Sequence, residues 1–182
     1  MPQVPASPSE LDHTDVILVD AEDRAVGTMA KLAAHESGQL HRAISVYLFN
    51  QAGELLIQRR APGKYHCGGQ WANTCCSHPV PGEMVAAAAS RRLWEEMGLS
   101  VPLRALFSMI YRVPVSDGLE EHEYLHVFVG QCDQDPVPNP AEADAWQFIS
   151  LAALQQDMQA QPQRYAPWLH EVLPALLSHM DC

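Results

Sequence analysis

The sequence predicts an α+β fold in which helices flank a mixed β-sheet, as in an α/β/α sandwich, within a single domain. Segments rich in β-branched and aromatic residues occur both before and after a central helix-forming segment, which is typical of a sheet covered by helices. The chain has 182 residues, of which 47% are hydrophobic. That length and composition suit one domain with its own buried core.

Strands are expected in the first half of the chain. Residues 16–19 form a short β-branched run, and residues 43–49 and 54–60 are strand-like segments that a short, Gly-containing turn would join into a hairpin. Residues 61–69 contain Pro and Gly and are predicted to be a loop. The next segment, residues 70–75, is predicted to resume a strand.

The second half begins with a strongly predicted helix. Residues 83–97 are rich in Ala, contain no Gly or Pro, and are followed by Gly98, which favours a helix that ends there. Apolar patterning then predicts three strands and two helices, in this order along the chain: residues 105–113, 124–129, 146–149, 151–160 and 168–179.

The N-terminal segment differs in composition from the rest. Residues 1–23 carry six acidic residues, several prolines and no Lys or Arg. We therefore expect a flexible N-terminus over residues 1–15 and one folded domain over residues 16–182. No apolar run approaches the roughly 20 residues that span a bilayer, so no membrane partner is expected. Five cysteines, an odd number without a secretory leader, argue against a disulfide framework and favour a cytoplasmic location.

The charge balance excludes one class of partner and points to another. The formal net charge of -11 argues against a nucleic-acid binder, because a phosphate backbone requires a basic face. The cations are unevenly distributed, however: residues 31–92 contain seven of the 11 Lys and Arg residues but only three of the 22 acids. Such clustering also arises by chance on solvated surfaces, so it becomes informative only beside a motif.

A motif does occur at the central helix, where acidic, basic, aliphatic and glycine residues recur at fixed spacing: Glu83, Arg91, Leu93, Glu95, Glu96 and Gly98. This pattern resembles the Nudix box, in which a loop and a helix present carboxylates to a metal-bound diphosphate. The chain departs from it at Ser77, where the box has Gly, and at Arg92, where it has Glu. Arg92 and Glu96 are four residues apart and share a helix face, so one can hold phosphate and the other a cation. An ordinary exposed ion pair is the alternative.

A second group of residues has the chemistry of a metal site. Cys76 precedes His78 by two residues, and two further histidines, His35 and His41, lie upstream. Glu121 and Glu123 point the same way if their segment is extended. Three imidazoles and two carboxylates suit a five- or six-coordinate divalent cation such as Zn²⁺, Mn²⁺ or Mg²⁺. Taken singly, each histidine is more commonly a surface or core residue, and the glutamates could form a solvated acidic edge.

Together these residues resemble the type 1 isopentenyl diphosphate isomerases, a family of the Nudix superfamily, from about residue 20 to residue 168. The matching segments are Lys31-Leu-Ala-Ala-His35, Leu40-His41, Leu48-Phe49-Asn50, Arg59-Arg60-Ala61, Trp71-Ala-Asn73, Cys76-Ser-His78-Pro79, Arg91-Arg92, Glu96-Met-Gly98, Tyr111-Arg112, Glu121-His-Glu123 and Pro167-Trp168. The resemblance implies a Nudix-type fold and an enzyme that interconverts isopentenyl and dimethylallyl diphosphates by moving a proton across an allylic unit. It implies a small-molecule diphosphate substrate, and we expect a monomer or a weak homodimer.

The resemblance also implies roles for individual residues. One divalent metal, Mn²⁺, Zn²⁺ or Mg²⁺, would be bound by His35, His41, His78, Glu121 and Glu123. Cys76 and Glu123 would exchange protons with the substrate from opposite sides, assisted by Tyr111. The diphosphate would be held by Lys31, Arg60, Lys64 and Arg92, with Glu96 on a Mg²⁺ that arrives with the substrate. Trp168 would cover the developing carbocation with its ring face.

Several alternatives stay open at this level. If residues 75 and 76 are extended, only one of Cys75 and Cys76 can face the site, and the spacing to His78 favours Cys76. Trp168 could instead pack in the core. A Nudix hydrolase of a nucleoside diphosphate derivative is the alternative enzyme, although Arg92 replaces the Glu that hydrolases place on the metal. A zinc- or redox-binding structural protein built on cysteines ranks lower, because the chain has no Cys-x-x-Cys pair.

Overall fold

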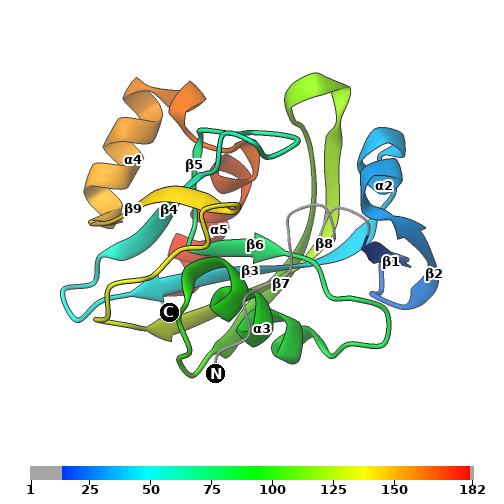
Figure 1. Ribbon diagram of the computed structural model, residues 1–182, viewed down its shortest axis with the longest axis horizontal. Helices are drawn as coiled ribbons and strands as arrows, with labels where there is room; N and C mark the ends of the chain where they lie inside the picture. Colours follow the sequence, from blue (N-terminus) through cyan, green and yellow to red (C-terminus); the bar gives the residue numbers. More distant parts are fainter. Residues whose placement is uncertain (1–13, 181–182) are drawn as a thin grey trace.

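The structure, a computed structural model, describes residues 14–180 of the chain. Within these residues nine strands form one sheet, with β3 (His41–Phe49) at its centre (Figure 1). This strand pairs in parallel with β8 (Glu120–Gln131) along its whole length and antiparallel with β6 (Cys75–Ser77). The sheet is therefore mixed, as predicted.

The remaining strands extend the sheet on either side of this centre. In the order of the chain they are β1 (Asp15–Val19), β2 (Ala25–Ala30), β4 (Leu55–Arg60), β5 (Trp71–Ala72), β7 (Arg104–Pro114) and β9 (Ala143–Ile149). The predicted hairpin is confirmed as β3 and β4, and β7 forms a long antiparallel hairpin with β8. Figure 1 shows this second hairpin projecting beside α2 (Lys31–Ser37).

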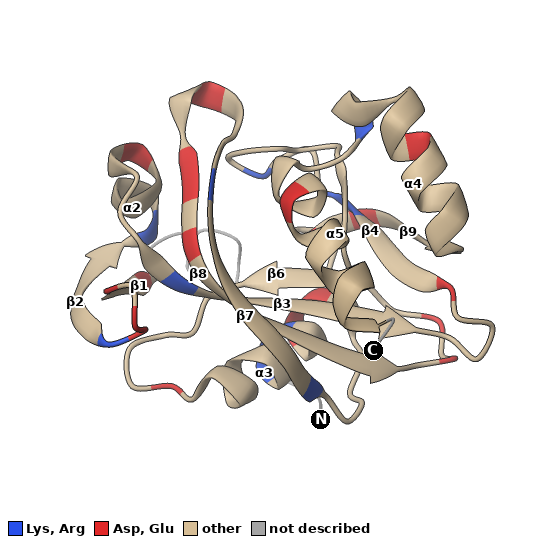
Figure 2. Ribbon diagram, turned by 180° about the vertical axis from the view of Figure 1, so that it is seen from behind, with Lys and Arg blue, Asp and Glu red and all other residues tan. Residues whose placement is uncertain are grey.

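Helices cover both faces of the sheet. The helix α3 (Val85–Met97) packs on one face, and α4 (Leu151–Ala160) and α5 (Pro167–Met180) pack on the other, as the front and back views show (Figures 1 and 2). From Ala43 to Phe49, strand β3 is apolar except for Ser45, because its successive side chains enter different core layers. Tyr47 packs with the α5 side and Leu48 with the α3 side. This arrangement confirms the predicted α/β/α sandwich. Two 3₁₀ turns, Ser116–Gly118 and Pro162–Arg164, complete the elements.

Two elements near the N-terminus were not predicted from the sequence. Strand β2 is almost entirely exposed and therefore has no apolar alternation, while α2 is only seven residues long. Asp15 already belongs to β1, and the rest of the flexible segment predicted for residues 1–15 lies outside the described residues, apart from Thr14.

Two boundaries differ from the prediction for a visible reason. The central helix begins at Val85 rather than at residue 83, because the Glu83 carboxylate accepts hydrogen bonds from the Val80 backbone and the Arg91 side chain and so belongs to the preceding loop. The strand predicted for residues 70–75 is instead two short strands. Between them the Thr74 hydroxyl accepts from the Leu48 amide and donates to a carbonyl of β4.

No helix in the described part of the chain is both long and apolar enough to cross a membrane.

Candidate active site

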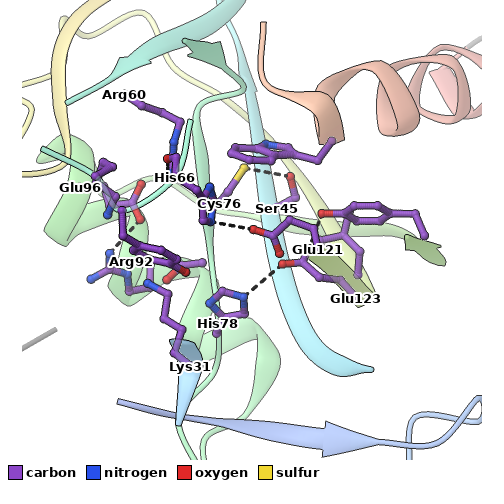
Figure 3. A pocket seen from close by; sticks show the side chains of 16 residues that line it. Lys31, Ser45, Arg60, His66, Cys76, His78, Arg92, Glu96, Glu121 and Glu123 are labelled. Atoms are coloured by element: carbon purple, nitrogen blue, oxygen red, sulfur yellow. Dashed lines mark hydrogen bonds and ion pairs between the residues drawn. The ribbon is translucent and has the colours of Figure 1, made fainter. Parts of the chain in front are cut away.

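A pocket opens where β3, β6 and β8 meet the loop that follows β4 (Figure 3). It is lined by Lys31, Ser45, Arg60, Lys64, Tyr65, His66, Cys76, Ser77, His78, Arg92, Glu96, Tyr111, Glu121, Glu123, Leu125 and Trp168. Every site residue expected from the sequence lines this central pocket except His35 and His41, which are fully buried beside it. The fold thus gathers residues that lie up to 137 positions apart in the chain, from Lys31 to Trp168.

One wall of the central pocket carries a cluster of imidazoles and carboxylates. Its members come from α2, β3, β8 and the residue that follows β6: His35, His41, His78, Glu121 and Glu123. Each offers one ligand atom, and these atoms all lie within 4.8 Å of one another. Because β8 is extended, its two glutamates share a face, as the sequence predicted, whereas His122 between them points the other way and contacts the Gly38 carbonyl.

The hydrogen bonds of two histidines test whether this cluster suits a cation. Nδ1 of His35 lies 2.6 Å from the Lys31 carbonyl, and Nδ1 of His41 lies 2.8 Å from the Gln39 carbonyl. A carbonyl only accepts, so each Nδ1 carries the hydrogen and each Nε2 of a neutral ring presents a lone pair. Nε2 of His41 faces Nε2 of His78 at 3.2 Å. Imidazole nitrogens that converge in this way, beside carboxylates, fit a divalent cation.

The two carboxylates of the cluster have opposite electrostatic tendencies. Burial opposes ionisation of Glu121, but the adjacent His35 and His66 rings outweigh it and hold the pKa of Glu121 well below its usual range. Burial, together with the negative charge of Glu121, raises the pKa of Glu123 to about 7. A cation between the carboxylates would relieve this repulsion and keep both ionised.

Across the central pocket lies Cys76, whose thiol donates a hydrogen bond of 2.8 Å to Oδ1 of Asn73. Burial raises the pKa of this thiol to about 12, so the proton is retained at neutral pH. Its neighbour Cys75 belongs to the core on the α3 side, since adjacent residues of β6 point to opposite faces. Only Cys76 of the two lines the pocket, as the strand alternation predicted.

The phenol of Tyr111 is hydrogen-bonded to the Glu123 carboxylate. Its hydroxyl donates a hydrogen bond of 2.6 Å to Oε2 of Glu123, while Oε1 of the same carboxylate lies 3.1 Å from Nε2 of His78. Burial raises the pKa of Tyr111 well above its usual value, so the phenol remains a hydrogen-bond donor. Glu123 is therefore both a candidate metal ligand and a candidate proton carrier (Figure 3).

Basic side chains form the wall of the central pocket that lies opposite the cluster of imidazoles and carboxylates. Arg92 donates from Nη2 to Glu96 at 2.8 Å and to Glu142 at 3.0 Å, and Lys64 donates to the other oxygen of Glu142 at 2.6 Å. Arg92 and Glu96 thus form the predicted pair on one helix face, but both are buried, which an ordinary exposed ion pair would not be. The buried cations and carboxylates of this wall can bind an anion together with a hard cation.

Trp168 both packs in the core and faces the central pocket. Its side chain belongs to the core on the α5 side and also lines the central pocket. The Arg60 guanidinium lies 5.0 Å from the centre of its ring, so the indole face already accommodates a cation in the folded protein.

Several residues of the site have no role that was predicted from the sequence. They are Ser45, Tyr65, His66, Ser77, Asn73 and Glu142. His66 is a notable histidine within the Gly-containing loop, but its partner Glu121 lies 55 positions later in the chain. Glu142 could not be found from local pattern, because its partners are on another loop and on α3.

Comparison with known proteins gives one consistent result. The sequence-family model described as the NUDIX domain matches residues 39–174. Isopentenyl-diphosphate Delta-isomerase 2 of Aromatoleum aromaticum is 51% identical over 163 residues, covering 90% of this chain and 86% of the relative. Isopentenyl-diphosphate Delta-isomerase of Pectobacterium atrosepticum is 48% identical over 155 residues, covering 85% of this chain and 87% of the relative. The crystal structure of DR0079 from Deinococcus radiodurans, at 20% identity, superposes with a TM-score of 0.75 over 88% of this chain and 98% of that one, which shows a shared fold.

Proposed function

Because the chain belongs to the isopentenyl-diphosphate Delta-isomerase family of the Nudix superfamily, we propose that it interconverts isopentenyl and dimethylallyl diphosphates. The observation that carries the proposal is the placement of Cys76 and Glu123 in one pocket with a wall of buried cations. The reaction requires a proton to be added at the terminal methylene carbon and another to be removed from carbon 2. One group that donates a proton and another that accepts one, placed in the same cavity, provide both steps without net consumption of a proton.

The side chains around this pair support the proton transfers. Tyr111 donates its hydroxyl hydrogen to Glu123 and so fixes which carboxylate oxygen faces the substrate. Trp168 offers a π face to the tertiary carbocation that forms between the two steps, an interaction worth on the order of 2 kcal/mol when desolvated. The buried pocket walls keep water from capturing that cation.

The cluster of three imidazoles and two carboxylates is proposed to bind one divalent cation, Mn²⁺, Zn²⁺ or Mg²⁺. Its positive charge would hold Glu121 and Glu123 ionised and in place. The diphosphate would lie against Lys31, Arg60, Lys64 and Arg92, with Glu96 binding a Mg²⁺ that accompanies the substrate. Arg92 occupies the position at which the Nudix box has a metal-binding Glu, and this argues against hydrolysis of a nucleoside diphosphate derivative.

The test is an assay of the purified chain with isopentenyl diphosphate and Mg²⁺. We expect dimethylallyl diphosphate with its diphosphate intact, identified by proton NMR as the loss of the terminal methylene signal. Release of inorganic phosphate alone, or recovery of unchanged substrate, would refute the proposal. Parallel incubation with nucleoside diphosphate derivatives tests the hydrolase alternative directly.

We further propose that the enzyme acts in the cytoplasm as a monomer or a weak homodimer, without a nucleic-acid partner. The net charge of -11 supports the last point, and the free state of Cys67, Cys75, Cys76 and Cys132 fits a reducing compartment. Sedimentation of the purified chain at several concentrations measures the oligomeric state.

A further inference from the structure

His66 is a buried histidine that the proposed reaction leaves without a role. It belongs to the loop between β4 and β5 and is only 4% exposed. Its Nε2 lies 3.0 Å from Oε1 of Glu121, and Nε2 of His35 lies 3.0 Å from Oε2 of the same carboxylate. Each oxygen of Glu121 therefore faces one imidazole.

The two imidazoles differ in what lies at their other nitrogen. Nδ1 of His35 donates to the Lys31 carbonyl, so in the neutral ring Nε2 is the nitrogen whose lone pair can bind a cation. Nδ1 of His66 is buried and has no hydrogen-bond partner among the described residues. The single hydrogen of a neutral His66 ring is therefore satisfied only on Nε2, where it is donated to Glu121. At the same distance from one carboxylate, His35 can bind a cation and His66 can donate a hydrogen bond.

The surroundings of His66 hold its ring in this direction. The ring packs edge to face against Tyr65, with centroids 4.5 Å apart, and against Trp168, with centroids 5.7 Å apart. The backbone carbonyl of His66 accepts a hydrogen bond of 3.2 Å from the Arg60 guanidinium. Side chain and backbone are thus both anchored, so Nε2 cannot readily turn away from Glu121.

We propose that His66 is a positioning residue for the metal site. Its Nε2–H holds Oε1 of Glu121 and leaves Oε2, beside the lone pair of His35, to bind the ion. The inference rests on the proposed metal cluster and deepens it, since it assigns a residue outside the ligand set. Removal of the hydrogen-bond partner of a metal ligand typically lowers metal affinity by about 10- to 100-fold.

Titration of the metal-free full chain with Mn²⁺, followed by electron paramagnetic resonance, tests the proposal without reference to activity. His66→Phe keeps a ring against Tyr65 and Trp168 but removes the donor, and we expect Mn²⁺ to bind at least about tenfold more weakly. His66→Gln provides an amide donor and should recover most of the affinity. His122→Phe, on the opposite face of β8, is the matched control and should bind like the wild type.

Wild-type Mn²⁺ affinity in His66→Phe would overturn the proposal. A second measurement needs no variant: long-range proton–nitrogen NMR of the wild type loaded with diamagnetic Mg²⁺ or Zn²⁺ reports which nitrogen of His66 carries hydrogen. We expect hydrogen on Nε2, and hydrogen on Nδ1 would contradict the role. Failure of the isomerase assay with normal Mn²⁺ binding would count against the proposed function alone, whereas a wild type that binds no divalent cation would overturn the inference as well.

Discussion

At the scale of single residues, two adjacent thiols have different surroundings. Cys76 lines the central pocket and donates to Asn73, whereas Cys75 is fully buried in the core beside α3. The difference follows from the period of two along β6. It makes the neighbouring cysteine an internal control for any experiment on the pocket thiol.

We predict that Cys76→Ala lowers kcat for isomerisation by about 10²- to 10⁴-fold, the usual contribution of a positioned proton donor or acceptor. The metal content should stay unchanged, because the thiol is not part of the cluster. Cys75→Ala should retain activity and lose about 1 kcal/mol of stability through its core cavity. Steady-state kinetics and metal analysis of both variants measure this, and an active Cys76→Ala enzyme would exclude the thiol from catalysis.

Tyr111→Phe should lower kcat by about tenfold or more while KM changes little. The substitution removes the hydroxyl that donates to Glu123 but keeps the ring in the core, so it affects the proton transfer rather than binding of the diphosphate. Tyr165→Phe is the control, since its hydroxyl bonds to Asp157 away from the pocket. A rise in KM with unchanged kcat would instead place Tyr111 in substrate binding.

At the scale of secondary-structure elements, the sequence predicted those helices and strands that have a clear periodicity or composition of their own. The β3–β4 hairpin, α3 and α4 have runs long enough to define a face. The exposed β2 and the seven-residue α2 have no such run, although α2 carries His35. Residues 121 and 123 were identified as facing the same way because a period of two needs only local information. The contacts of His66 and Glu142 could not be predicted, because they depend on tertiary packing between distant loops.

Glu142 links two elements that carry the basic wall. Its carboxylate accepts from Lys64, on the loop after β4, and from Arg92, on α3. Burial opposes its ionisation, but these two cations outweigh that effect and lower the pKa of Glu142 to about 2 from an ordinary 4.5. A depressed carboxyl pKa stabilises the folded state above the unfolded value, and this stability is lost as the pH falls from about 4.5 towards 2.

Glu142→Gln should therefore lower the free energy of unfolding at pH 7 by up to about 3 kcal/mol, at roughly 1.4 kcal/mol per pKa unit. Urea denaturation of both proteins measures the difference, which should shrink as the pH falls below about 4 and Glu142 becomes protonated in the unfolded chain. Glu171→Gln, an exposed position on α5, should leave stability unchanged. A deficit that persists undiminished at low pH would show that packing, rather than charge, is responsible.

At the scale of the whole molecule, the net charge of -11 conceals a local arrangement of both signs. Four cations from residues 31–92 line the central pocket, as the uneven distribution along the sequence suggested, and they face carboxylates from α3 and β8. Figure 2 shows acidic residues along the β7–β8 hairpin beside α2. The fold thus gathers four cations and three carboxylates at the cavity where a diphosphate with its Mg²⁺ is proposed to bind.

The proposed metal site also connects separate elements of the fold, because its five residues come from α2, β3, β8 and the end of β6. A cation that binds only the folded chain should stabilise it by about 2.7 kcal/mol at 100 times its Kd. For a chain of this size that raises the Tm by about 5 to 10 °C.

Calorimetry of chelator-treated protein with added Mn²⁺ or Zn²⁺ should record this shift. His78→Ala should reduce it and His122→Ala should retain it, because only the first removes a proposed ligand. Equal shifts in the two variants would mean that the cation binds elsewhere.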